Sequence, residues 1–172
     1  MIIGLTGLHG CGKSHIANIL EKEFNCYLID KRKSLEKYFS KQFFSVDSQE
    51  SIEWYRSIYK EYGPATLINL LIEHIPNDKA TIIDAIHNPI EWNTIKEKFP
   101  SSLLVGVFSP HIIRIARNNP QDILLDIKRI NYWHCDNQCL LSSIEWAFTG
   151  LASASFQKKE CEVLMHYLKI DH

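Results

Sequence analysis

The residues best suited to chemistry lie near the amino terminus, where Gly7-Leu8-His9-Gly10-Cys11-Gly12-Lys13-Ser14 is a complete G-x-x-x-x-G-K-[ST] phosphate-binding pattern. Its glycines let the backbone bend so that successive N–H groups point inward and cradle a phosphate. We expect Lys13 to place a compact positive charge on the β- and γ-phosphates, and the Ser14 hydroxyl to bind Mg²⁺. The pattern predicts a site for ATP and Mg²⁺. The residues expected to hold the nucleotide are Gly7, Leu8, His9, Gly10, Cys11, Gly12, Lys13, Ser14 and His15.

Two flanking elements should position this loop. The run from Met1 to Thr6 is short and mostly apolar, as a buried strand is. The run from Lys13 to Phe24 carries apolar residues three and four apart, which predicts an amphipathic helix. A strand, a glycine loop and a helix are the context in which this pattern binds phosphate.

Further strands are expected at Cys26 to Ile29, Ala80 to Ile86 and Leu103 to Phe108. The last two lead into Asn88-Pro89 and Ser109-Pro110, each a helix N-cap followed by proline at the first helical position. Strands that alternate with capped helices predict an α/β protein with a three-layer α/β/α P-loop NTPase fold, built on a parallel sheet.

The rest of the chain predicts mainly helices, within a single domain spanning residues 1–172. Residues 31–79 are expected to form a helical insertion that binds the phosphate acceptor, and residues 110–148 a lid-like helical region. Expected helices within the insertion are Lys33 to Lys41, Asp47 to Lys60 with an Asp47…Glu50 capping box, and a helix opened by Gly63-Pro64. Another capped helix is expected at Asn119-Pro120, a fifth strand at Leu151 to Phe156, and a closing helix at Gln157 to Leu168.

Two acidic residues end predicted strands. Because ligands of such sheets bind at the carboxyl ends of the strands, we expect Asp30 and Asp84 to face the phosphate loop. Asp84 would assist Ser14 in holding Mg²⁺, and Asp30 would orient or deprotonate the acceptor hydroxyl. The alternative for Asp30 is a solvated strand-end acid that begins the next helix, and the alternative for Asp84 is a strand-end cap.

Arginines supply the other candidate charges. Arg114 and Arg117 lie three apart, on one face of a predicted helix, and could neutralise the γ-phosphate during transfer. Arg129 is a weaker candidate, since Asp126 could pair with it along the helix. Arg56 could hold a phosphate of the acceptor. Each could equally be an ordinary surface arginine.

Cys11 lies within the loop, at a helix N-terminus and beside Lys13. Both surroundings favour a reactive thiolate that bound nucleotide would protect. The alternative is a sulfur that simply packs against the helix.

Composition excludes several classes of protein. The 172 residues are 45% apolar and 23% charged, with a net charge of −1. There is no basic excess to suggest nucleic acid, and no apolar run long enough to span a membrane. The first expected strand leaves no room for a signal peptide, and five cysteines are most simply reduced thiols. We therefore expect a cytoplasmic protein.

The order of these motifs resembles the nucleotide-kinase-like P-loop proteins. Ile3-Gly4-Leu5-Thr6-Gly7, the phosphate loop and Cys26-Tyr27-Leu28-Ile29-Asp30 look like the start of dephospho-coenzyme A kinases, whose corresponding aspartate lies near the acceptor hydroxyl. Tyr62-Gly63-Pro64-Ala65 and Ile82-Ile83-Asp84-Ala85-Ile86-His87 are more similar to archaeal-type adenylate kinase-like proteins. The resemblance implies an ATP- and Mg²⁺-dependent kinase acting on a nucleotide or nucleotide-like small molecule.

Some positions depart from these families. Arg32 stands where dephospho-coenzyme A kinases carry a second acid, and His87 stands where the related kinases carry an arginine. The arginines of the lid-like region are also more widely spaced. These departures keep a second function open, that of a nucleotide-binding regulatory or degenerate P-loop protein without productive turnover.

Overall fold

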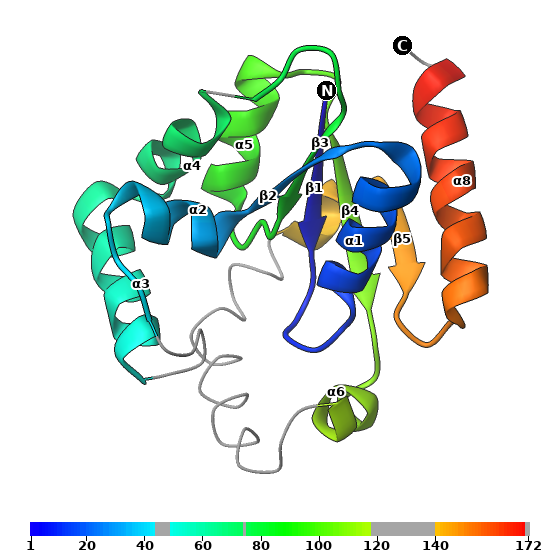
Figure 1. Cartoon of the computed structure of the whole chain (residues 1–172), viewed down its shortest axis with the longest axis horizontal. Helices are drawn as coiled ribbons and strands as arrows, with labels where there is room; N and C mark the ends of the chain where they lie inside the picture. The colour runs from blue at the N-terminus through cyan, green and yellow to red at the C-terminus, as the bar shows by residue number, and fades with distance from the viewer. Residues whose placement is uncertain (44–48, 74, 118–139, 171–172) are drawn as a thin grey trace.

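The computed structural model describes residues 1–43, 49–73, 75–117 and 140–170. Five parallel strands form one sheet in the order β2-β3-β1-β4-β5 (Figure 1). The strands are β1 (Ile2–Thr6), β2 (Tyr27–Asp30), β3 (Thr81–Asp84), β4 (Leu103–Phe108) and β5 (Trp146–Thr149). The helices are α1 (Lys13–Phe24), α2 (Lys31–Tyr38), α3 (Gln49–Tyr62), α4 (Pro64–Ile72), α5 (Pro89–Lys98), α6 (His111–Arg117) and α8 (Ala154–Ile170), with a short 3-10 turn, η2 (Leu141–Ser143).

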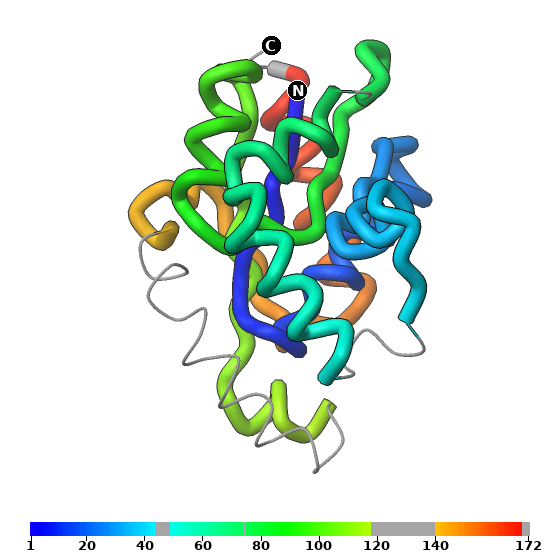
Figure 2. The backbone as a smooth tube through the Cα atoms, turned by 90° about the vertical axis from the view of Figure 1, so that its left-hand side faces the viewer, coloured from blue at the N-terminus to red at the C-terminus, as the bar shows by residue number. Residues whose placement is uncertain are grey.

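The strand order places β1 at the centre and a change of direction beside it. From β1 the chain moves to one side of the sheet to form β2, and from β3 it crosses to the other side to form β4. In open α/β sheets ligands bind outside the carboxyl ends of the strands at such a point. The register pairs Leu5 with Asp84 and Asp30 with Asp84, so the ends of β1, β2 and β3 lie at one edge. Figure 2, turned by 90°, shows α6 on the side of the molecule toward which β1 runs.

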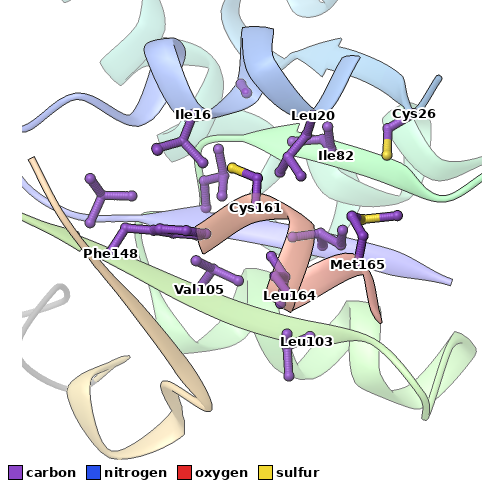
Figure 3. Packing of buried hydrophobic residues seen from close by; sticks show 14 of the residues in the cluster. Ile16, Leu20, Cys26, Ile82, Leu103, Val105, Phe148, Cys161, Leu164 and Met165 are labelled. Carbon is purple, nitrogen blue, oxygen red and sulfur yellow. The ribbon is translucent and has the colours of Figure 1, made fainter. Parts of the chain in front are cut away.

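Helices cover both faces of the sheet and bury two cores. On one face α1 packs against α8, and their side chains meet β1 and β4 around Ile16, Leu20, Val105, Cys161 and Leu164 (Figure 3). On the other face α4 packs against α5, and the core there includes residues of α3 as well. The arrangement is the three-layer α/β/α sandwich that the alternation of strands and helices predicts.

The fifth strand is the main correction to the predicted elements. It lies at Trp146–Thr149, inside the region expected to be helical, whereas Gly150 and Leu151 form a turn and α8 begins at Ala154. The Ser153 hydroxyl accepts a hydrogen bond from the Phe156 N–H at 3.3 Å, so the small residues there start a helix. The strand is only four residues long and has one buried residue, Phe148, which leaves little periodicity to detect.

Other boundaries follow from capping. α2 begins two residues earlier than expected because the Asp30 carboxylate accepts a hydrogen bond from the Lys33 N–H at 3.1 Å. The expected caps at Asn88 and at Gly63-Pro64 are confirmed, since Asn88 accepts from the Glu91 N–H at 3.0 Å and α4 begins at Pro64. The expected capping box at Asp47 and the helix at Asn119-Pro120 lie outside the described residues. Within the described residues, no helix is both long enough and apolar enough to cross a membrane.

Candidate active site

The phosphate loop connects β1 to α1 and has the backbone that its glycines predict. Gly7, Gly10 and Gly12 have φ angles of 140°, 73° and 108°, a region that side chains disfavour. Space adds a second constraint at Gly7, where a Cβ atom would lie 2.3 Å from the carbonyl oxygen of Val107. The loop is therefore compact and lies directly against β4.

Helix α1 presents its amino-terminal end to this loop. Gly12 is the N-cap of this helix, all of which is described. No side chain accepts a hydrogen bond from the first turn, and the first turn contains no acidic residue. The N–H groups of a first turn and the helix dipole together favour an anion. His15, also expected near the nucleotide, lies exposed in the same turn.

Lys13 folds back over the loop. Its ammonium donates hydrogen bonds to the carbonyl oxygens of Gly7 at 2.9 Å and Leu8 at 3.0 Å. A positive charge is thus held at the loop, where a phosphate ligand would need it.

Ser14 and Asp84 meet at the loop. The Ser14 hydroxyl donates a hydrogen bond to the Asp84 carboxylate at 2.7 Å, although the two residues lie 70 positions apart in sequence. Both groups offer the hard oxygen ligands that Mg²⁺ prefers. Elsewhere among the described residues there is no cluster of three or more His, Cys, Asp or Glu able to hold a metal ion. The pair fits Mg²⁺, which takes few protein ligands and keeps its other positions for phosphate oxygens and water.

Asp30 lies beside Asp84 on the neighbouring strand, as expected. Its carboxylate also caps α2 and forms an ion pair with Lys33 at 3.2 Å. The position at the sheet edge and the capping role therefore occur together in one side chain.

Arg114 and Arg117 reach the loop from α6, and their guanidinium groups donate hydrogen bonds to backbone carbonyl oxygens of the loop. The Arg114 guanidinium donates to the carbonyl oxygen of His9 at 3.1 Å and lies 3.1 Å from His111 Nδ1. Arg117 donates to the carbonyl oxygens of Gly10 at 3.2 Å and Gly150 at 2.5 Å. Arg129 lies outside the described residues. Arg56 lies half-buried on α3.

Ser109 and Gly150 are two loop contacts that sequence reasoning missed. Ser109 was expected to cap the next helix, but that helix begins at His111 and the Ser109 hydroxyl instead donates to the Cys11 carbonyl at 2.9 Å. Gly150, after β5, approaches so closely that a Cβ atom would lie 2.0 Å from the same carbonyl oxygen. The Ser109-Pro110 pattern indicates a helix cap and gives no signal of a contact with the phosphate loop.

Cys11 is enclosed, which favours the packing alternative over the reactive thiol. Its side chain is 1% exposed and belongs to the core beneath α1. The Lys13 ammonium lies 3.8 Å from the sulfur. A reagent could reach this thiol only if the loop opened.

A buried ionic network, also missed, lies next to the carboxyl ends of β2 and β3. Lys31 and Glu91 form an ion pair at 2.7 Å, with side chains that are 2% and 1% exposed. The Glu91 carboxylate also accepts hydrogen bonds from the Tyr59 hydroxyl and, at 2.7 Å, from the His87 N–H. Desolvation raises the pKa of Tyr59 well above its usual value, and the negative charge of Glu91 adds to the shift. One carboxylate thus joins α2, α3 and the segment after β3.

His87 lies among positive charges at the end of this segment. Burial lowers the pKa of its imidazole well below the ordinary value of 6.5, and the charges of Lys31, Lys13 and Arg32 act in the same direction. The ring is therefore neutral at pH 7, and it carries no positive charge at the position that departs from the resembling families.

Comparison with known proteins gives a fold. No family model and no curated protein matches the sequence. Among solved structures, the chain is similar to the shikimate kinase from Aquifex aeolicus, with 18% identity, a TM-score of 0.65 and coverage of 100% of both chains. It is also similar to the Acinetobacter baumannii shikimate kinase in complex with shikimate, with 12% identity, a TM-score of 0.66 and coverage of 96% of this chain and 93% of that one. The Bacteroides thetaiotaomicron shikimate kinase matches with 15% identity, a TM-score of 0.62 and coverage of 96% and 98%.

The chain has the three-layer α/β/α P-loop fold of these structures. At these identities the likeness concerns the fold alone. Because the neighbours are shikimate kinases, the finer resemblance to dephospho-coenzyme A kinases and adenylate kinase-like proteins stays a prediction.

Proposed function

We propose that this protein transfers the γ-phosphoryl group of ATP, in the presence of Mg²⁺, to a hydroxyl group of a small molecule, with a nucleotide or nucleotide-like compound as acceptor. The observation that carries the proposal is the 2.7 Å contact between Ser14 and Asp84 at a complete phosphate loop. It joins a P-loop hydroxyl to an acid at a strand end, the two protein ligands that P-loop enzymes use for Mg²⁺.

The residues divide between the two substrates. Ser14 and Asp84 would hold Mg²⁺, which would neutralise negative charge on the phosphates. Lys13 would add the mobile positive charge, with Arg114 and Arg117 contributing charge at the rim of the loop. Catalysis in this class depends on positioning and electrostatics more than on covalent chemistry.

Asp30 would act on the acceptor. It lies on the strand next to Asp84, so it can orient a hydroxyl toward the γ-phosphate. Near it, the Arg32 guanidinium lies 5.4 Å from the centre of the Tyr55 ring, which offers a positive charge beside an aromatic surface. Arg56 on the same insertion would hold a phosphate of the acceptor. This combination suits an anionic acceptor.

A second class of acceptor is favoured by the fold likeness. One neighbour was solved in complex with shikimate, and the similarity covers nearly the whole of both chains. A small hydroxylated carboxylic acid would present the same two features as a nucleotide, a hydroxyl for transfer and an anion for recognition.

An acceptor panel tests the proposal. Release of ADP from ATP is measured with nucleoside monophosphates, dephospho-coenzyme A, shikimate and no acceptor, using the wild-type protein and Lys13→Ala. We expect one acceptor to stimulate ADP release in the wild type only. Tight binding of ATP without any stimulation would instead support the alternative of a nucleotide-binding regulatory protein.

A further inference from the structure

Three successive carbonyl groups of the phosphate loop are each held by a separate side chain. The His9 carbonyl accepts from Arg114 at 3.1 Å, the Gly10 carbonyl from Arg117 at 3.2 Å, and the Cys11 carbonyl from Ser109 at 2.9 Å. All three donors come from one short segment, residues 109–117, which follows β4. We call these three contacts the carbonyl clamp.

Peptide geometry gives the carbonyl clamp a consequence for ligand binding. Because the peptide unit is planar and trans, the C=O of one residue and the N–H of the next point in opposite directions. A bond that holds the His9 carbonyl toward α6 therefore turns the Gly10 N–H away from α6. In the same way, the bond from Ser109 to the Cys11 carbonyl turns the Gly12 N–H away from the segment.

The glycines explain why the loop needs such support. Gly10 and Gly12 have positive φ angles of 73° and 108°, and glycine backbones are the least restricted of all. Without external bonds these peptide units could rotate, and ordering them would reduce the affinity for a phosphate ligand. Gly150 packs against the same point, where a Cβ atom would lie 2.0 Å from both the Cys11 carbonyl oxygen and the Ser109 hydroxyl oxygen.

Arg114 is suited to a holding role. Its side chain is 3% exposed, and its fork reaches the His9 carbonyl with one nitrogen while the other lies 3.1 Å from His111 Nδ1. Arginine can make both contacts at once because its donors are fixed in a plane, whereas lysine offers one compact group.

We propose that Ser109 and Arg114 are positioning residues that pre-orient the amide groups of the phosphate loop for the diphosphate part of a nucleotide. The inference rests on the proposed nucleotide site and adds to it a role for the segment after β4. It differs from a role in neutralising the γ-phosphate, because a pre-oriented loop benefits ADP and ATP alike.

The test compares two nucleotides on variants of the full chain. Binding of MgADP and of Mg²⁺ with a non-hydrolysable ATP analogue is measured by calorimetry, without acceptor. Ser109→Ala removes a hydrogen bond and no charge, so it leaves long-range attraction for phosphate intact. We expect it to weaken both nucleotides by about three- to tenfold, the usual effect of one lost hydrogen bond, in a ligand-free protein that stays folded at the assay temperature.

Ser57→Ala is the matched control, because the Ser57 hydroxyl likewise donates to a backbone carbonyl, that of Trp54 at 2.7 Å, but within α3. It should leave both affinities at the wild-type value. Arg114→Lys keeps the charge and loses the fork, and should also weaken both nucleotides, by about tenfold.

Unchanged affinities in Ser109→Ala would overturn the inference. So would an Arg114→Lys protein that loses affinity for the ATP analogue alone, or a wild-type protein that binds neither nucleotide. Because no acceptor is present, an absence of kinase turnover leaves this test intact. Conversely, if the Ser109→Ala affinities are unchanged but an acceptor stimulates ADP release, the inference about the carbonyl clamp is wrong and the proposed function stands.

Discussion

Replacing Glu91 should strongly destabilise the folded protein. In Glu91→Gln the side chain keeps its size and loses its charge, which leaves the Lys31 ammonium buried without a counter-ion. The carboxylate also accepts from the Tyr59 hydroxyl and the His87 N–H, and an amide offers a single oxygen for three donors. Breaking a buried pair in this way typically costs about 3–5 kcal/mol.

The chain contains a matched control for this cost. Lys158 and Glu23 form an ion pair at the same 2.7 Å distance, but both side chains are 46% exposed. Solvent screens such a pair, so Glu23→Gln should leave the free energy of unfolding almost unchanged. The two variants make the same chemical change at the same distance, but the Glu91 carboxylate is buried and also accepts from Tyr59 and His87, whereas the Glu23 carboxylate is half exposed.

Urea unfolding followed by tryptophan fluorescence measures the difference. With a slope of about 2 kcal/mol per M, the loss at Glu91 should lower the midpoint by roughly 1.5–2.5 M, against no resolvable shift at Glu23. The double variant Lys31→Met/Glu91→Leu removes both charges and should recover part of the loss. Equal midpoints for Glu91→Gln and Glu23→Gln would refute the view that the buried network around Glu91 stabilises the fold.

Three further predictions concern the candidate site. Lys13→Ala should lower turnover at least about a hundredfold, or roughly 2.7 kcal/mol of transition-state stabilisation, and leave unfolding unchanged; wild-type turnover would place the active site elsewhere. Asp30→Asn should depress turnover at normal ATP affinity, whereas Asp84→Asn should raise the Mg²⁺ concentration needed, so identical kinetics would contradict this division. The folded state holds His87 neutral while the unfolded chain takes up a proton below pH 6.5, so stability should fall as pH drops below that value, by at most about 1.4 kcal/mol per pH unit. His87→Asn should flatten this fall in urea titrations, and parallel curves for the two proteins would exclude His87 as its source.

The arrangement of the phosphate loop, where the proposed nucleotide would bind, could be predicted because its signals are local. The glycines of the loop, the helix after it and the acid at the end of β3 each follow from short stretches of sequence, and parallel strands bring their carboxyl ends together. The 2.7 Å contact of Ser14 with Asp84 confirms that these positions meet. What each residue does there stays a prediction until it is tested.

The carbonyl clamp could not be predicted in the same way. Ser109 precedes a proline and therefore has the pattern of a helix cap, and a single hydroxyl carries no mark of a partner 98 residues away. Likewise Gly150 needs no positive φ; its small size matters only because the end of β5 packs against the phosphate loop.

The region proposed to bind the acceptor depends on contacts that are distant in sequence. Glu91 looks like an ordinary first-turn acid of α5, and Lys31 like a surface lysine of a charged helix, until the sheet places them together 60 residues apart. Their pair fixes the start of α2, which follows Asp30 directly, and Tyr59 fixes α3 to the same carboxylate. The proposed nucleotide site therefore follows from the sequence of the loop itself, whereas the proposed acceptor site would depend on this network, which holds α2 and α3 against the strand ends.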